Sequence, residues 1–246
     1  NPATGNGWAT TTSTVSSGGA MAVATRPPES ASAFPRAGTV LRFDRVERVV
    51  HWVTAALFGV LIVTGGALYV SPIMRVVGHR QIVELAHLAA GLALPIPLLA
   101  AVAGRWGRGV RVDLRRFNRW TSDDVTWLRV SMRNRDDRRV ARAALLDGKF
   151  NAGQKLNAAF TAGAGLVLLG TGVIMYWFHP WPVSWRTGAT YAHDWLASLV
   201  VVAIVGHISY ALRDPDALSS MRRGTISRTW ARAHARGWLR ELDADS

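Results

Sequence analysis

The chain has 246 residues, no cysteine and a formal net charge of +13. Without cysteine it cannot form a disulfide, ligate an iron–sulfur cluster, hold haem through a thiolate or attach haem covalently through a CxxCH motif. Its mean hydropathy is positive although it carries 29 lysines and arginines, so apolar and basic residues must lie in separate segments, as in a membrane protein.

The first 40 residues are rich in Ser, Thr, Gly, Ala and Pro and show no apolar periodicity. This composition predicts a flexible leader over 1–40, followed by a folded domain over 41–246. No apolar core with a cleavage site precedes the first long apolar stretch, so we do not expect a removable signal peptide. Met21 is a candidate alternative start.

Four apolar stretches follow, and each has the roughly 20 residues that a helix needs to cross a bilayer core. They lie at about 49–70, 82–102, 156–178 and 191–212. Pro95 and Pro97 predict a kink in the second stretch. The predicted fold class is therefore an all-α membrane protein, a bundle of four transmembrane helices.

Arginine is distributed unevenly among the connections. It is abundant before the first span, in the 104–155 connection and in the tail after 212, whereas the other two connections hold only Arg75, Arg80 and Arg186. Because positive residues stay on the cytoplasmic side, we expect both termini, the middle connection and the basic tail to lie inside. Nucleic-acid binding, the other explanation for a basic chain, does not account for this alternation.

The 104–155 connection is too long for a bare loop in a compact domain. Arg and Asp alternate in it with large apolar side chains, which predicts a short amphipathic helix at the inner surface. The apolar residues concerned are Trp120, Val125, Trp127, Leu128, Val130 and Met132.

Two histidines of the fourth span, His193 and His207, are fourteen residues apart. At about 100° and 1.5 Å per residue, they face one side of the helix within roughly 40° and lie about 21 Å apart along its axis. An ionisable residue inside lipid is costly and normally has a partner in the bundle interior. Two of them on one stripe, near opposite membrane faces, predict two stacked sites of the same kind.

The expected depth in the membrane identifies a partner for each of these two histidines. His51 and His207 lie near the inner ends of their spans, and His87 and His193 near the outer ends. Paired imidazoles suit zinc, copper or haem iron, but zinc normally takes further protein ligands, and no cysteine or carboxylate accompanies either pair at helical spacing. Bis-histidine haem b needs only two axial nitrogens and an apolar slot, and it suits electron transfer. Glycines that could make room for the macrocycle are Gly65, Gly66, Gly91, Gly163, Gly165, Gly170, Gly172 and Gly206.

A haem-free bundle, such as a transporter or a passive anchor, is the alternative. A single membrane histidine is more often a hydrogen-bonded bundle residue than a ligand, whereas four that pair by depth across three helices favour ligation. The other three histidines, His79, His179 and His234, fall in outer connections or the tail, and we expect them to be solvated.

Four segments carry a resemblance to a known family. Residues 42–52, RFDRVERVVHW, with Thr-Gly at 64–65, resemble the first helix of bacterial membrane cytochrome b subunits. Residues 148–155, GKFNAGQK, and 224–234, GTISRTWARAH, are more specifically similar to the gamma subunit of respiratory formate dehydrogenase. The spacing of the two histidines in the fourth span agrees, and the resemblance covers about residue 40 to the C-terminus.

The resemblance implies a dihaem subunit of the bacterial cytoplasmic membrane that anchors an iron–sulfur beta subunit and a molybdenum- or tungsten-containing alpha subunit. Matched to the family, His87 and His193 would ligate the outer haem b and His51 and His207 the inner one, the same pairing that depth predicts. Electrons would pass from the outer-face iron–sulfur protein through both haems to menaquinone or ubiquinone. Residues expected at the quinone site are His207, Asn151 and Gln154.

The expected function is that of an electron-transfer, quinone-reducing subunit in anaerobic respiration, in a complex that can form a higher oligomer and binds no nucleic acid. No group in this chain could oxidise formate, so that step belongs to a partner. The closest alternative keeps the chemistry and changes the donor, to a nickel–iron hydrogenase or a thiosulfate reductase. For Asn151 and Gln154 the alternative role is a helix cap, since Asn is a good N-cap.

Overall fold

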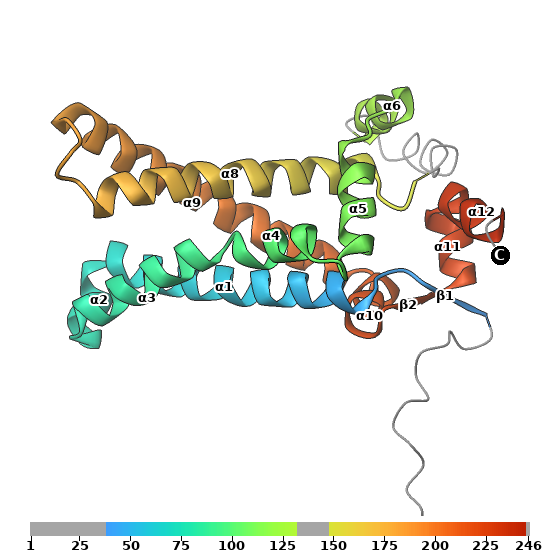
Figure 1. Cartoon of the computed structure of the whole chain (residues 1–246), viewed down its shortest axis with the longest axis horizontal. Helices are drawn as coiled ribbons and strands as arrows, with labels where there is room; N and C mark the ends of the chain where they lie inside the picture. The colour runs from blue at the N-terminus through green and yellow to red at the C-terminus, as the bar shows by residue number, and fades with distance from the viewer. Residues whose placement is uncertain (1–37, 132–147, 245–246) are drawn as a thin grey trace, which may run out of the picture. The chain divides into compact units, whose positions relative to one another are not determined.

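The computed structural model describes residues 38–131 and 148–244, which form helices and one small sheet (Figure 1). Four helical segments are long and apolar enough to cross a membrane, the second of them formed by two helices in series. The predicted all-α fold with four spans is confirmed. The helices concerned are α1 (Arg45–Tyr69), α3 (Arg80–Ala93), α4 (Ile96–Ala103), α8 (Ala152–Tyr176) and α9 (Val183–Leu212).

Two of the spanning helices begin with a polar cap, four residues before the apolar stretches predicted at 49–70 and 156–178. Asp44 caps α1, because its carboxylate accepts a hydrogen bond from the Glu47 backbone while the Glu47 side chain accepts one from the Asp44 backbone. Asn151 and Gln154 form the same reciprocal capping box at the start of α8. A capping box satisfies backbone N–H groups that a helix N-terminus otherwise leaves without partners. The predicted cap role of Asn151 is therefore confirmed.

The second span breaks where the prolines predict. Helix α3 ends at Ala93 and α4 begins at Ile96, with the Leu94 N–H bonded to the Gly91 carbonyl at 3.3 Å instead of to the carbonyl four residues back. Pro95 has no N–H to continue the ladder, whereas Pro97 lies in the first turn of α4, where that loss costs little.

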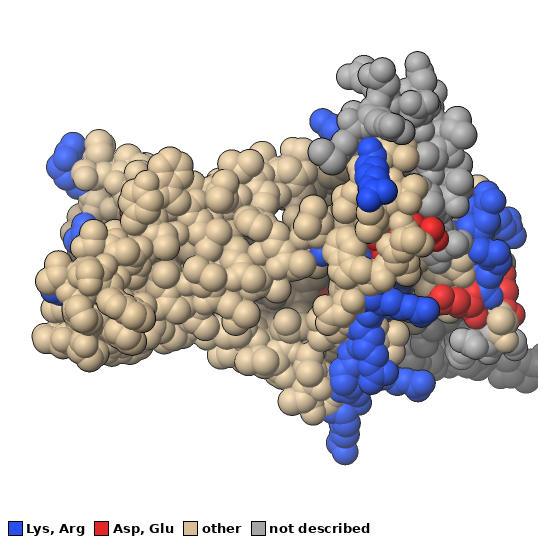
Figure 2. All heavy atoms as spheres, turned by 90° about the horizontal axis from the view of Figure 1, so that it is seen from above, with Lys and Arg blue, Asp and Glu red and all other residues tan. Residues whose placement is uncertain are grey.

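The spans pack as two antiparallel pairs, α1 against α3 and α8 against α9 (Figure 1). Large apolar side chains on their outer faces are exposed, for example Val63, Leu166 and Val202 at about 70%. Lys and Arg gather at the two ends of the molecule and above all at one of them, leaving an uncharged band between (Figure 2). A band of this kind is what a helical bundle presents to lipid. We call the end where α1 begins the arginine-rich end.

In its described residues, 104–131 and 148–155, the middle connection forms the helices α5 (Arg108–Asn118) and α6 (Ser122–Ser131) at the arginine-rich end. The predicted amphipathic helix corresponds to α6, and Met132 lies outside the described residues. Helix α5 was not predicted, because we assigned its arginines to topology alone. It buries Val110 and Asp113, so its inner face joins the fold.

The tail is also structured. It forms α10 (Pro215–Arg223), β2 (Thr225–Ser227), α11 (Arg228–His234) and α12 (Arg236–Ala244). A further short helix, α2 (Ser71–Val77), lies in the connection between the first two spans. Strand β1 (Thr39–Leu41) pairs antiparallel with β2, and Val40 and Ile226 lie in a small core with Trp238 and Leu239. The predicted leader, 1–40, thus includes the first two residues of β1. Its positions 1–37 lie outside the described residues. The domain boundary at 40/41 stays a prediction.

Gly224 joins the tail to the start of α1. Its carbonyl accepts hydrogen bonds from the backbone N–H groups of Arg42 and Phe43, at 2.8 and 3.0 Å. Its φ of +89° is left-handed, and a Cβ there would lie 2.7 Å from the Phe43 carbonyl oxygen, so only glycine fits without a shift.

Arg42, beside this turn, is buried. Burial lowers the pKa of its guanidinium to about 10, and the nearby carboxylates of Asp214 and Asp113 oppose this shift. The guanidinium therefore remains charged at neutral pH.

Candidate functional site

The structure brings together the four histidines in the two pairs that depth predicts. His51 of α1 and His207 of α9, the inner pair, have ring centroids 6.3 Å apart. His87 of α3 and His193 of α9, the outer pair, also have centroids 6.3 Å apart. Helix α9 therefore supplies one histidine to each pair, and the inner pair lies toward the arginine-rich end.

The separation within each pair suits one metal ion. An imidazole nitrogen binds a transition metal at about 2 Å and lies roughly 1 Å from its ring centroid, so imidazoles on opposite sides of one ion have centroids about 6 Å apart. The rings are inclined at 59° and 61°, so neither pair is a parallel stack. No third His, Cys, Asp or Glu joins either pair within 38–131 and 148–244, which suits a metal whose other ligands come from a macrocycle.

The surroundings of the pairs differ. His51, His87 and His193 are half-buried, whereas His207 is exposed on its helix. A Cβ at Gly65 would lie 3.2 Å from Cε1 of His87, and one at Gly172 would lie 3.5 Å from Cε1 of His193. Two of the eight candidate glycines thus lie against the outer pair. Of the others, Gly91 and Gly165 face leucine side chains, and the rest have no atom within 4 Å of a built Cβ, namely Gly66, Gly163, Gly170 and Gly206.

Two threonines that were not predicted as site residues contact the outer pair. Oγ1 of Thr64 in α1 lies 2.9 Å from Nδ1 of His87, and Oγ1 of Thr171 in α8 lies 2.9 Å from Nδ1 of His193. In the sequence, Thr64 stands out only as part of the Thr-Gly motif at 64–65. Nothing in the sequence marks Thr171, because its contact depends on how α8 packs on α9.

Asn151 and Gln154 lie at the arginine-rich end of α8. Their side-chain oxygens accept the capping hydrogen bonds, at 2.9 Å for Asn151 and 3.0 Å for Gln154. The cap uses only the oxygen of each amide, so it leaves the NH2 group chemically available as a donor. The next residue along the helix, Lys155, binds both carboxylate oxygens of Asp124, at 2.9 and 2.7 Å, and so fastens α8 to α6.

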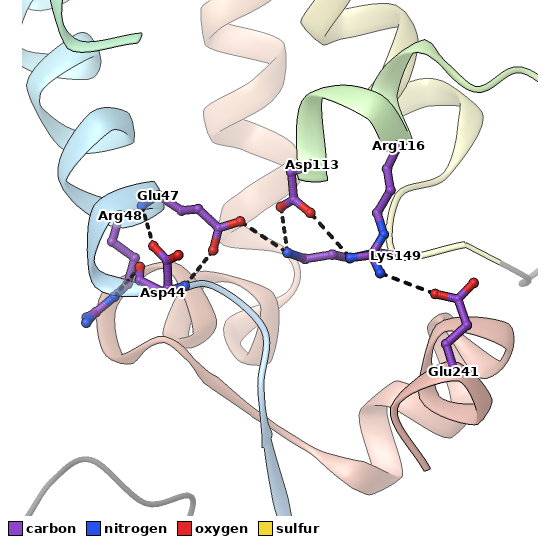
Figure 3. A network of polar contacts seen from close by, with 7 residues as sticks. All are labelled: Asp44, Glu47, Arg48, Asp113, Arg116, Lys149 and Glu241. Atoms are coloured by element: carbon purple, nitrogen blue, oxygen red, sulfur yellow. Dashed lines mark hydrogen bonds and ion pairs between the residues drawn. The ribbon is translucent and has the colours of Figure 1, made fainter. Parts of the chain in front are cut away.

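A network of ion pairs lies at the arginine-rich end of the bundle (Figure 3). Nζ of Lys149 lies 2.5 Å from Asp113 of α5 and 3.4 Å from Glu47 of α1. Arg116 extends the network, contacting Asp113 at 3.4 Å and Glu241 of α12 at 3.2 Å. The network was not predicted, because its members lie far apart in sequence and are joined only by the fold. It holds four segments of the chain together beside the inner pair's end of the bundle.

The other histidines are exposed, as expected: His79, His179 and His234.

Four apolar spans that carry two histidine pairs, each with ring centroids 6.3 Å apart, fit the class of membrane cytochromes b. The family model described as prokaryotic cytochrome b561 matches residues 42–224, and the chain belongs to this family. Membership implies haem b as a cofactor.

Curated relatives agree with the resemblance found in the motifs. The chain is 26% identical over 213 residues to the formate dehydrogenase cytochrome b556(fdo) subunit of Escherichia coli K12, covering 84% of this chain and 95% of that one. It is 24% identical over 212 residues to the nitrate-inducible cytochrome b556(Fdn) subunit of the same organism, covering 83% and 92%. The Haemophilus influenzae formate dehydrogenase cytochrome b556 subunit is 22% identical over 210 residues, covering 82% and 83%. The predicted resemblance to the formate dehydrogenase gamma subunit is thus confirmed.

Proposed function

We propose that this chain is the dihaem, quinone-reducing membrane subunit of a formate dehydrogenase. The observation that carries the proposal is the double pairing of histidines, each with ring centroids 6.3 Å apart and each joining α9 to another span. The names of the relatives support the choice of complex, with an iron–sulfur beta subunit and a molybdenum or tungsten alpha subunit as partners. Formate oxidation itself takes place on the alpha subunit.

The residues of this chain set the electron path. His87 and His193 would hold the outer haem, and His51 and His207 would hold the inner one. Haem b at each pair would supply one-electron redox chemistry. The two positions on α9 lie about 21 Å apart along the helix axis, so together they lead electrons across most of the hydrocarbon core.

The quinone binds at the arginine-rich end. His207 is exposed there, so its second ring nitrogen can reach a quinone carbonyl, and the NH2 groups of Asn151 and Gln154 supply further donors. Quinone reduction at this end takes two protons from the inner side. Because formate oxidation releases protons outside, the couple contributes to the membrane potential without a proton pump.

The arginine distribution supports the proposed orientation. Most Lys and Arg lie at the end formed by α5, α6 and the tail helices (Figure 2). With positive residues inside, both termini and the quinone site face the cytoplasm, and the outer pair faces the iron–sulfur partner across the bacterial inner membrane.

Haem stoichiometry tests the proposal. We expect the purified complex to contain two b haems per copy of this chain, measured by reduced-minus-oxidised spectra and pyridine haemochrome analysis. A cofactor-replete preparation without a b-type alpha band, or with a single haem, would overturn it. The large subunit that co-purifies, and the metal that it contains, distinguish a formate dehydrogenase from a hydrogenase or thiosulfate reductase.

A cap-preserving substitution separates the two roles of Asn151. Asn151→Asp keeps the side-chain oxygen that caps α8 but removes the NH2 donor, because Asp is as good an N-cap as Asn. We expect quinone turnover to fall roughly tenfold, the cost of one hydrogen bond of about 1.4 kcal/mol, while both haems stay. Steady-state kinetics with a quinone analogue measure the effect, and Gln154→Glu is the parallel variant. Wild-type kinetics in Asn151→Asp would leave Asn151 with the cap alone.

A further inference from the structure

All four spans contribute to the outer site, although only two of them carry its histidines. Thr64 of α1 contacts His87 of α3, and Thr171 of α8 contacts His193 of α9, each at 2.9 Å between Oγ1 and Nδ1. Each threonine is followed by a glycine, at 65 and 172, whose built Cβ would lie against the same imidazole. A Thr-Gly pair thus supports each ring from the neighbouring helix.

The direction of both hydrogen bonds follows from the other contact of each hydroxyl. Oγ1 of Thr64 lies 2.6 Å from the Val60 carbonyl, and Oγ1 of Thr171 lies 2.8 Å from the Val167 carbonyl. A carbonyl can only accept, so each hydroxyl gives its single proton to the backbone and accepts one from the ring. The proton of each imidazole is then on Nδ1, which the backbone carbonyls of Leu61 at His87 and Leu168 at His193 also favour as acceptors. The lone pair of Nε2 is left for a metal.

We propose that Thr64 and Thr171 are positioning residues of the outer haem, which fix the tautomer and the ring orientation of its two ligands. The inference rests on the proposed function, since it takes His87 and His193 to be axial ligands. Within 38–131 and 148–244 no equivalent side-chain hydrogen bond is made to His51 or His207. The two haem sites therefore differ in the hydrogen bonds made to their ligands while sharing the same ligand set.

This difference lowers the midpoint potential of the outer haem. A ligand that donates its second N–H to an acceptor is more basic and gives more electron density to the metal. The oxidised iron gains more from that density than the reduced iron, so the threonines lower the potential of the outer haem. The chain of bonds from ring to hydroxyl to carbonyl strengthens the effect, because hydrogen bonds in series polarise one another.

Valine variants test the proposal on the intact complex. Thr64→Val and Thr171→Val keep the shape and remove the hydroxyl. We expect each variant to raise the midpoint potential of the outer haem. At a fixed solution potential, the ratio of oxidised to reduced outer haem should then fall several-fold, up to about tenfold. For a one-electron couple, a tenfold change corresponds to about 59 mV. Redox titration of the two alpha bands measures the shift, and the electron paramagnetic resonance g-values of the ferric outer haem report its ring orientation.

Two controls accompany the valine variants. Thr190→Val removes a hydroxyl that also bonds the carbonyl four residues back, at 3.0 Å, and that makes no hydrogen bond to a histidine within 38–131 and 148–244. This variant should leave both potentials unchanged. Thr64→Ser and Thr171→Ser keep the hydroxyl and should behave as the wild type. If a valine variant loses the outer haem while its serine variant keeps it, the hydroxyl is required and the inference stands.

Three results would overturn the inference: unchanged potential and g-values in both valine variants, an equal shift of both haems, or loss of the outer haem in the serine variants as well. The first leaves the threonines as helix residues that satisfy their own backbone. None of these results touches the proposed function, which fails separately if the wild-type complex lacks two haems.

Discussion

Alanine at His87 or His193 is expected to remove the outer haem and leave the inner one, and alanine at His51 or His207 to do the reverse. Each pair has ring centroids 6.3 Å apart, so under the proposed function both members of a pair would be needed to hold one haem iron. A variant that lacks one of these nitrogens would hold its haem too weakly to retain it. Haem content should fall from two to one per chain, measured by pyridine haemochrome analysis, with loss of one alpha-band component.

The pairing is tested by combining variants. His87→Ala with His193→Ala should lose no more haem than either alone, whereas His193→Ala with His207→Ala should lose both, although both residues lie on α9. His234→Ala, an exposed histidine of the tail, is the control and should keep two haems. If His51→Ala and His87→Ala lost the same haem, the pairing would be wrong.

The pairing could be predicted from sequence because helix geometry converts residue number into depth. A rise of 1.5 Å per residue places His193 and His207 near opposite membrane faces, and only His87 and His51 match them. The break at Pro95 is equally local, since it follows from a missing N–H. The spans and the depth of each histidine thus follow from properties of single segments.

Features that depend on contacts between segments were missed. Thr171 is an ordinary helix residue until α8 packs on α9, and Lys149 has two buried carboxylate partners only because α1 and α5 meet beside it. The buried face of α5 was not predicted, because we interpreted its arginines only as a signal of membrane topology. The caps at Asp44 and Asn151 extend two helices beyond their apolar stretches, which hydropathy alone does not detect.

Lys149→Met is expected to cost about 3–5 kcal/mol in the free energy of unfolding, the usual result of removing one partner from a buried ion pair. The Lys149 side chain is 5% exposed, and its partners Glu47 and Asp113 are 10% and 9% exposed, so the loss leaves two carboxylates facing each other away from water. Methionine keeps most of the side chain's volume, so the effect reports the charge. Unfolding by SDS titration in mixed micelles measures it.

Two comparisons separate charge from packing. Arg80→Met removes an ion pair with Glu84 whose side chains are 64% and 42% exposed, and should cost only about 0.3–0.5 kcal/mol. Combining Lys149→Met with Glu47→Gln and Asp113→Asn removes all three charges, and Gln still completes the capping box of α1. Because replacing a whole buried ionic group by neutral residues is often tolerated, the triple variant should recover most of the lost stability. A triple variant as unstable as Lys149→Met would mean that shape, rather than the unpaired carboxylates, accounts for the loss.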